Sequence, residues 1–252
     1  MFLKIIKKII IKIFSRFGYS VSYNADNLIL KISKDFKEIY NKTAPYTQTS
    51  PERIYAMYKA TQYILENKIQ GDIVECGAWK GGSMMASALT LKLLHNTKRK
   101  LYLYDTYEGM SKPLKIDSQA SDNLNALRLW ENSQKKNINK WNYASLEEVE
   151  RNMFSTKYPK EKLIFVKGKV EDTIPKIMPS SISLLRLDTD LYKSTYHELK
   201  YLYPRLSKGG IIIIDDYASW RGAKKAIDKY FSENKIKIFI TVLDKTGLIG
   251  VK

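Results

Sequence analysis

Four aspartates follow two apolar runs in the C-terminal half of the chain. Asp188 and Asp190 come after the run ISLLRL, which begins at Ile182, and Asp215 and Asp216 come directly after the run IIII. A run with little alternation is typical of a strand that is buried on both faces of a parallel sheet. An amphipathic span and a Gly-Gly break separate the two runs. The stretch therefore predicts a strand, a helix and a second strand.

These carboxylates could bind a divalent cation. Neighbouring parallel strands lie about 4.8 Å apart, so side chains at their carboxyl ends converge, and ligands of open α/β sheets bind at this edge. Carboxylates so close together raise one another's pKa unless a cation neutralises them. All-oxygen ligands favour Mg²⁺, with Mn²⁺ or Ca²⁺ as alternatives. We predict Asp188, Asp215 and Asp216 as ligands; the alternative is that strand-end aspartates only cap loops or lie in solvated turns.

A glycine-rich turn follows an earlier predicted strand. Residues 72–76 (DIVEC) form a short apolar strand that carries Glu75, and residues 77–83 (GAWKGGS) lead into a predicted helix. Such a turn lets a ligand approach the backbone and the N-terminus of the helix. A dinucleotide fingerprint would need glycine where Trp79 stands, and a P-loop would need lysine where Ser83 stands. Phosphate binding by this turn is therefore not supported.

The next predicted strand, residues 100–105 (KLYLYD), ends in Asp105. A carboxylate at the end of the second strand commonly binds the hydroxyls of a ribose. A glycine turn with this acid, and without a phosphate motif, points to S-adenosylmethionine. Glu171 and Asp172 follow the third predicted strand, residues 163–168. They could contact the adenine, or they could be first-turn charges that the helix dipole favours.

The remaining segments complete one α/β domain. Further helices are predicted over residues 25–40, 51–67, 145–154 and 220–232, and further strands over 237–243 and 248–252, which would add an antiparallel edge. Residues 106–150 contain a long polar insertion, which is typical of a lid or of a disordered segment. We predict a helical extension over 1–45 and the α/β domain over 46–252.

Residues 1–17 (MFLKIIKKIIIKIFSRF) form an amphipathic pattern. At 100° per residue the apolar side chains share one face and the basic side chains lie opposite, which describes a helix in a membrane interface. The segment is too charged to span a bilayer, and it lacks the features of a cleaved signal peptide. The alternative is a helix that packs on its own domain or on another subunit. We expect a cytoplasmic protein, with peripheral contact at the inner face of the membrane if the first interpretation holds.

The composition limits the classes of protein. The chain of 252 residues carries 43 basic and 26 acidic residues, a net charge of +17, which indicates an anionic partner: nucleic acid, an anionic membrane or a phosphorylated substrate. The single cysteine, Cys76, excludes an internal disulfide framework and a cysteine-type zinc site. The alternative functions are a basic RNA-binding or RNA-modifying methyltransferase, for which no RNP, zinc or helix-turn-helix signature is visible, and a membrane-attached scaffold with an inactive enzyme fold.

Several motifs occur in one order along the chain. They are residues 75–82 (ECGAWKGG), 105–110 (DTYEGM), 145–149 (SLEEV), 168–173 (GKVEDT), 187–195 (LDTDLYKST), 202–206 (LYPRL) and 214–217 (IDDY). Over residues 46–252 the chain thereby resembles the macrocin O-methyltransferase family, of the TylF/MycF type. The resemblance implies a class I S-adenosylmethionine-dependent methyltransferase fold, a Rossmann-like three-layer α/β sandwich. It also implies S-adenosylmethionine as the donor and a Mg²⁺ ion that holds a sugar hydroxyl.

The resemblance implies roles for single residues as well. Asp188, Asp215 and Asp216 would bind the metal, and Asp190 would be the general base, so Asp188 and Asp190 are the predicted catalytic residues. The predicted donor-binding residues are Glu75, Gly77, Ser83, Asp105, Glu171 and Asp172, with Asp105 at the ribose and Asp172 near the adenine. Thr47 and Gln48, with Tyr46, match the segment that covers the cofactor and the acceptor in such enzymes.

The sequence indicates the acceptor less directly than it indicates the methyl donor. The interfacial pattern of residues 1–17 suggests a sugar of a surface polysaccharide or another glycoconjugate. Sugars and small phenols are poorly distinguished by the sequence, and the insertion over residues 111–144 differs from that of members acting on antibiotic sugars. We expect a homo-oligomer and no nucleic-acid partner.

Overall fold

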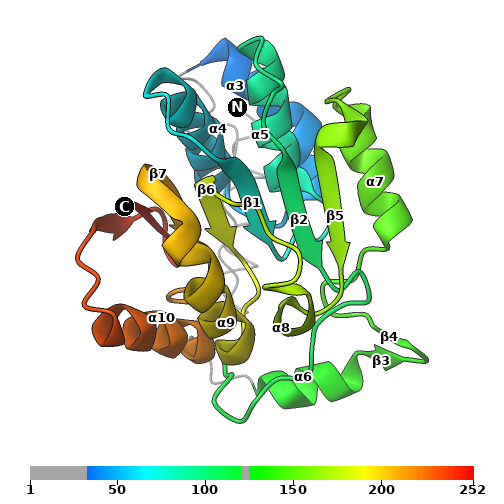
Figure 1. Ribbon diagram of the computed structural model, residues 1–252. Helices are drawn as coiled ribbons and strands as arrows, with labels where there is room; N and C mark the ends of the chain where they lie inside the picture. Colours follow the sequence, from blue (N-terminus) through cyan, green and yellow to red (C-terminus); the bar gives the residue numbers. More distant parts are fainter. Residues whose placement is uncertain (1–32, 121–124) are drawn as a thin grey trace, which may run out of the picture.

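The computed structural model describes residues 33–120 and 125–252, which form a seven-stranded sheet between two layers of helices (Figure 1). The strand order is β5-β2-β1-β6-β7-β9-β8. The parallel strands are β1 (Asp72–Cys76), β2 (Leu101–Asp105), β5 (Leu163–Lys167), β6 (Ile182–Leu187) and β7 (Leu206–Ile214). The strands β9 (Leu248–Val251) and β8 (Phe239–Val242) pair antiparallel at one edge. The predicted α/β class and the predicted antiparallel edge are confirmed.

Each face of the sheet has its own apolar core, because successive side chains of a strand point to opposite faces. On β1, Ile73 belongs to one core and Val74 to the other. The first core is covered by α3 (Lys34–Thr43), α4 (Pro51–Glu66), α5 (Gly82–Leu93) and α7 (Leu146–Ser155). The second is covered by α8 (Val170–Thr173), α9 (Tyr192–Leu202) and α10 (Arg221–Glu233). The predicted three-layer sandwich is therefore confirmed.

Helix starts agree with the capping signals in the sequence. The Ser50 hydroxyl accepts a hydrogen bond of 3.3 Å from the Arg53 amide at the start of α4, and the Ser145 hydroxyl accepts one of 3.2 Å from the Glu148 amide at the start of α7. These bonds satisfy amides that have no partner within the helix. Both predicted helices thus begin at the expected residues.

The N-terminal extension is described only from residue 33. The amphipathic segment 1–17 and the first part of the helix predicted over 25–40 lie outside the described residues. Helix α3 corresponds to the last part of the helix predicted over 25–40, but it continues to Thr43. Its Phe36 side chain is completely buried in the core that α4 and α5 share. The packed domain therefore begins before residue 46.

The Gly-Gly break was expected between a helix and a strand, and this expectation is wrong. Gly209 and Gly210 lie within β7. The register explains why: Ile182 of β6 faces Leu206, whereas Leu184 faces Ile211, so β7 contains extra residues that bulge out of the sheet. Gly209 has a φ of +78°, a conformation that favours glycine. The glycines thus shape the strand and do not begin it.

The insertion is folded over its described residues. It contains α6 (Ala126–Asn132) and the hairpin of β3 (Gln134–Lys135) and β4 (Ile138–Asn139). The buried carboxylate of Asp117 accepts a hydrogen bond of 2.8 Å from the amide of Tyr192, the first residue of α9. This bond attaches the insertion to the carboxyl end of the sheet, where a predicted lid would have to lie. Among the described residues, no helix is long and apolar enough to cross a membrane.

Candidate active site

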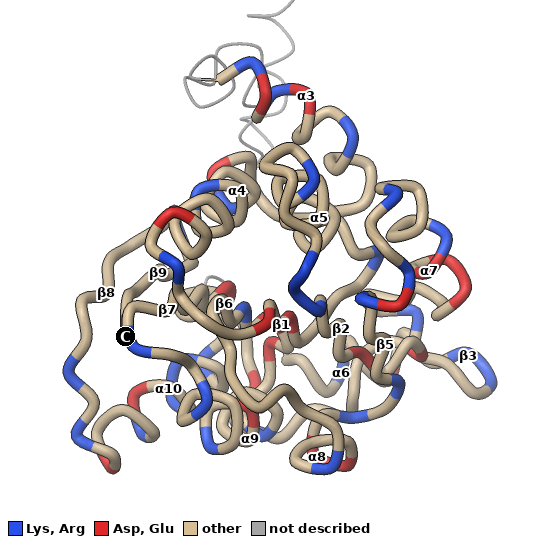
Figure 2. Tube along the Cα trace, turned by 45° about the horizontal axis from the view of Figure 1, so that its top comes forward, with Lys and Arg blue, Asp and Glu red and all other residues tan. Residues whose placement is uncertain are grey.

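A cavity of about 350 Å³ opens at the carboxyl ends of the parallel strands. The residues that follow β1, β2, β5, β6 and β7 all contribute to its lining, including Gly77, Asp105, Glu171, Asp188 and Asp216. In Figure 2, acidic positions lie in the middle of the molecule near β1 and β6, whereas many lysines and arginines lie on the outer helices and loops. Many of the predicted site residues therefore lie together at this edge of the sheet.

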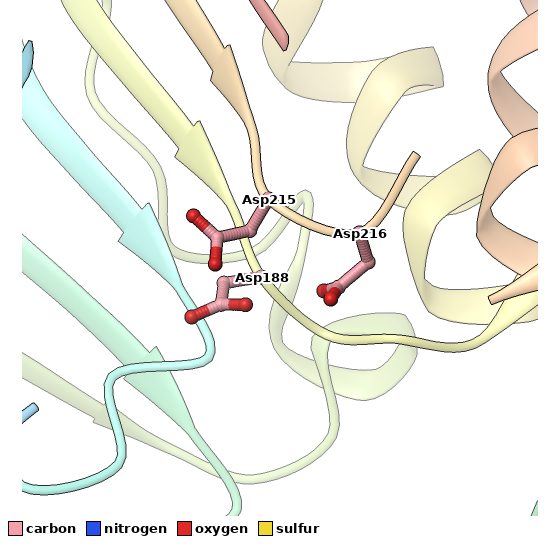
Figure 3. A group of neighbouring side chains, drawn as sticks. All are labelled: Asp188, Asp215 and Asp216. Carbon is pink, nitrogen blue, oxygen red and sulfur yellow. The ribbon is translucent and has the colours of Figure 1, made fainter. Parts of the chain in front are cut away.

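The predicted cation ligands converge from two chain segments. One carboxylate oxygen each of Asp188, Asp215 and Asp216 lies within 4.8 Å of the others, and Figure 3 shows the three carboxylates around a common space. Burial raises the pKa of Asp188 and of Asp216 well above the ordinary value; Arg186 lowers that of Asp188, and the neighbouring carboxylates raise both. The Oδ2 atom of Asp216 is buried and accepts no hydrogen bond from the described residues. These residues fit a hard divalent cation.

A buried arginine forms the floor under two of these carboxylates. Arg186, only 2% exposed, places Nη2 2.7 Å from Asp188 Oδ2 and 2.8 Å from Asp215 Oδ1. Its Nη1 atom lies 2.5 Å from Oε1 of Glu75, which is 1% exposed. Burial alone would lower the pKa of Arg186, but the three carboxylates raise it well above its ordinary value. Arg186 therefore places its positive charge beside Asp188 and Asp215, although its Nη2 atom makes no hydrogen bond of good geometry with either.

A second arginine reaches the same cluster from helix α4. Arg53 donates from Nη1 to Oδ2 of Asp215, so the two oxygens of Asp215 face two different guanidinium groups. The sequence reasoning missed both arginines. A signal existed for Arg186, since it is the one charged residue in the apolar run ISLLRL; the sequence contains no comparable signal for Arg53.

Asp190 lies at the wall of the same cavity and is 7% exposed. Its φ of +64° is a left-handed conformation that non-glycine residues seldom adopt. Burial raises the pKa of Asp190 to about 7, a hydrogen bond with Asp216 opposes the rise, and the charges of Asp188 and Asp215 add to it. A carboxyl group that titrates near neutral pH is suited to accept a proton from a hydroxyl.

One part of the cavity, where the donor is predicted to bind, is formed by the turn after β1. Gly77 has a φ of +84°, and a Cβ atom there would lie 1.9 Å from the carbonyl oxygen of Asp188. Asp105 accepts hydrogen bonds from the amides of Trp79 at 3.0 Å and Tyr107 at 2.9 Å. At Gly82 a Cβ atom would lie 2.5 Å from the carbonyl oxygen of Tyr46. The segment that begins at Tyr46 therefore covers the start of α5.

The structure separates the predicted donor-binding residues into two groups. The cavity is lined by Thr47, Gln48, Gly77, Ser83, Asp105 and Glu171. Glu75 and Asp172 are not among the lining residues, and their roles in donor binding stay predictions. Glu75 is buried, and its carboxylate forms an ion pair with Arg186. Asp172, on the short helix α8, is exposed, whereas its neighbour Glu171 lines the cavity.

The other end of the cavity is partly aromatic. Trp141 of the insertion and Trp220, at the start of α10, line it together with Met110 and Asn142. The two indole rings lie 5.4 Å apart between centroids, at 44°. The sequence reasoning did not assign either tryptophan to the site. The insertion thus contributes to the lining of the cavity.

The fold and the motifs were compared with known proteins. The sequence pattern of the family described as "Macrocin-O-methyltransferase (TylF)" matches residues 25–250. A Streptomyces olivaceus protein, 8-demethyl-8-(2,3-dimethoxy-alpha-L-rhamnosyl)-tetracenomycin-C 4'-O-methyltransferase, is 29% identical over 254 residues, which cover 98% of this chain and 91% of that protein. Mycinamicin III 3''-O-methyltransferase of Micromonospora griseorubida is 26% identical over 211 residues, 82% of this chain and 78% of that protein.

Solved structures support the same fold. The O-methyltransferase NovP superposes with a TM-score of 0.71 at 26% identity, over 82% of each chain. An O-methyltransferase from Bacillus cereus in complex with SAH has a TM-score of 0.53 at 12% identity, over 90% of this chain and 96% of that one, and so shows a shared fold. The RNA-directed alternative finds no support among these proteins. The chain belongs to the macrocin O-methyltransferase family and is an S-adenosylmethionine-dependent O-methyltransferase.

Proposed function

We propose that this enzyme methylates a sugar hydroxyl with the help of a Mg²⁺ ion bound by Asp188, Asp215 and Asp216. The observation that carries the proposal is the convergence of these three carboxylates within 4.8 Å, in the wall of a cavity that the Gly77 turn and Asp105 also line. The relatives named above are themselves named as methyltransferases of glycosides, which supports a sugar acceptor.

The residues divide the reaction among them. The hydroxyl oxygen attacks the methyl carbon of the donor, the bond from that carbon to sulfur breaks with its electrons going to sulfur, and the hydroxyl proton moves to Asp190. A bound divalent ion supplies Lewis-acid chemistry that makes an alcohol more acidic. Asp105 and the Gly77 turn hold the donor, and Trp141 and Trp220 hold the acceptor in the orientation for attack. Arg186 places its positive charge beside Asp188 and Asp215.

The acceptor that we propose is a sugar of a surface polysaccharide or of another glycoconjugate. The net charge of +17 favours an anionic acceptor or surface. The amphipathic pattern of residues 1–17 favours peripheral contact with a membrane, where lipid-linked sugars are found. The folded insertion supplies one wall of the acceptor side, so differences in this segment are expected to select among sugars.

The proposal is tested by supplying the full-length protein with isotopically labelled S-adenosylmethionine, a panel of glycosides and nucleotide sugars, and either Mg²⁺ or a chelator. We expect label in a sugar methyl ether only when the divalent ion is present. Transfer that is undiminished by the chelator would remove the metal from the proposal. Transfer to a catechol or another phenol, and to no sugar of the panel, would remove the sugar.

A further inference from the structure

Arg53 joins three parts of the molecule in one hydrogen-bonded network. Its Nη1 atom donates to Asp215 and its Nη2 atom donates to the hydroxyl of Thr246. The Nε atom lies 2.8 Å from Oδ2 of Asp244, and Nη2 lies 3.1 Å from Oδ1 of the same carboxylate. Arg53 is 11% exposed and Asp244 is 14% exposed, so water screens this network only weakly. We call Ser50, Arg53, Asp215, Asp244 and Thr246 the Arg53 network.

Asp244 is the fixed centre of the network. Its carboxylate accepts hydrogen bonds from the amides of Thr246 at 3.0 Å and Gly247 at 2.9 Å, in the turn between β8 and β9. It also accepts one of 2.8 Å from the hydroxyl of Ser50. A carboxylate with so many donors stays ionised, and the pKa of Asp244 is held below its ordinary value: burial opposes this, and the hydrogen bonds from Arg53 and the turn outweigh burial. Asp244 therefore holds Arg53 at a set distance from Asp215.

We propose that Arg53 is a positioning residue that competes with the divalent cation for Asp215, and that Asp244 sets the strength of this competition. The inference rests on the proposed cation site of Asp188, Asp215 and Asp216. It extends that proposal, because it assigns opposite effects on cation affinity to two residues that lie outside the ligand set. The guanidinium is shared between two carboxylates, and only one of them belongs to the cation site.

The sign of each effect follows from charge. Arg53 donates directly to an oxygen of Asp215, so its positive charge lies within a few ångströms of any ion that Asp215 binds, and it repels that ion. At the effective dielectric of a protein, a unit charge at such a distance changes cation affinity by about tenfold or more. Loss of Asp244 leaves Asp215 as the remaining carboxylate partner of Arg53, which strengthens the competition. The charge of Arg186 still lies beside the other oxygen of Asp215 when Arg53 is replaced.

The experiment titrates the full-length protein with Mn²⁺ and follows the free ion by electron paramagnetic resonance, without donor or acceptor. We expect Arg53→Gln to bind Mn²⁺ about tenfold more tightly than wild type, and Asp244→Asn to bind it more weakly. In the double variant Arg53→Gln/Asp244→Asn the effect of the Asp244 change should be largely lost, because Asp244 acts through Arg53. The exposed pair Lys224 and Asp228 on α10, 2.8 Å apart, provides matched control variants that should leave Mn²⁺ affinity unchanged.

The outcomes are separable from loss of folding and from failure of the proposed function. Arg53→Lys keeps the charge and should bind Mn²⁺ nearly as wild type does, and thermal melts check that each variant is folded. Equal directions of change in the two single variants, or a full Asp244 effect in the double variant, would overturn the inference. A wild-type protein that binds S-adenosylhomocysteine but no Mn²⁺ would overturn the proposed cation site and this inference together, and would leave the methyltransferase assignment standing.

Discussion

At the level of single residues, the site concentrates negative charge that two arginines only partly balance. Arg186 and Arg53 pair with the carboxylates of Glu75, Asp188 and Asp215, and the buried carboxylates of Asp190 and Asp216 line the same cavity. Breaking a buried ion pair by removing one partner commonly costs about 3–5 kcal/mol, since the other charge is left uncompensated. The carboxylates of the cluster therefore repel one another, and a cationic donor and a divalent ion would reduce this repulsion.

Replacing the aspartates separates binding from chemistry. We expect Asp190→Asn to reduce kcat by about 10²-fold to 10⁴-fold, the usual contribution of a general base, while Mn²⁺ and S-adenosylhomocysteine still bind. Asp188→Ala should abolish both methyl transfer and Mn²⁺ binding and leave donor binding nearly intact. Steady-state kinetics and calorimetric titration with each ligand check both variants. Full activity of Asp188→Ala without added metal would contradict the proposed role of this residue.

Glu198 makes stability depend on pH. It is fully buried on α9, and burial raises its pKa to about 8, opposed by a hydrogen bond of 2.9 Å from Thr189 and assisted by the charge of Glu171. A carboxyl group whose folded pKa is raised contributes stability that is complete below its unfolded pKa, near 4.5, and is lost as pH rises through about 8. The pH range in which stability is lost thus lies above the ordinary pKa of a glutamate, because burial raises the pKa of Glu198.

When the pH is raised from about 5 to about 9, the free energy of unfolding should therefore fall by roughly 2–4 kcal/mol less in Glu198→Gln than in wild type. Urea unfolding at the two pH values measures the difference. The exposed residue Glu161 provides the control, since Glu161→Gln should follow the wild-type pH dependence. An identical pH dependence of wild type and Glu198→Gln would show that Glu198 is ionised in the folded protein at both pH values.

At the level of elements, the N-terminus of α4 serves two purposes. Ser50 caps the helix and also donates to Asp244, directly after the segment that covers the donor side of the cavity. Ser145 caps α7 in the same way. Neither serine lines the cavity, but only Ser50 directly follows the lining residues 46–49, so the two serines form a matched pair.

We expect Ser50→Ala and Ser145→Ala each to cost about 1 kcal/mol of stability, the usual effect of losing an N-cap. Only Ser50→Ala should also weaken the binding of S-adenosylhomocysteine, by a few fold, because only this change loosens residues 46–49. Thermal melts and calorimetric titration of both variants check this. Equal donor affinities in the two variants would show that the covering segment does not depend on Ser50.

The elements also show which parts of the site could be predicted. The aspartates at the ends of β6 and β7 could be paired from the sequence, since parallel strands align their carboxyl ends. The link from Arg53 to Asp215 spans 162 positions and depends on how α4 packs against β7, which no local pattern encodes. Gly209 was misassigned because a bulge and a strand start use the same residue types.

At the level of the whole molecule, many basic residues lie away from the acidic cavity, whereas Arg53 and Arg186 lie at it. The net charge of +17 is carried on outer helices and loops and on residues 1–17, which lie outside the described part of the chain. We expect full-length protein to float with anionic vesicles, and protein lacking residues 1–17 to lose this binding. Neutral vesicles and raised salt serve as controls. Unchanged flotation after truncation would remove the membrane interpretation, and a helix that packs on another subunit would remain.

One contact limits how this enzyme can be altered. The backbone of Gly77 touches the carbonyl of Asp188 so closely that no side chain fits between them. The glycine-rich turn after β1 and the loop that begins at Asp188 are therefore in direct backbone contact, and neither can shift without the other. New acceptor preferences are better sought by varying the insertion that carries Trp141, which lines the cavity and takes no part in the contact between Gly77 and Asp188.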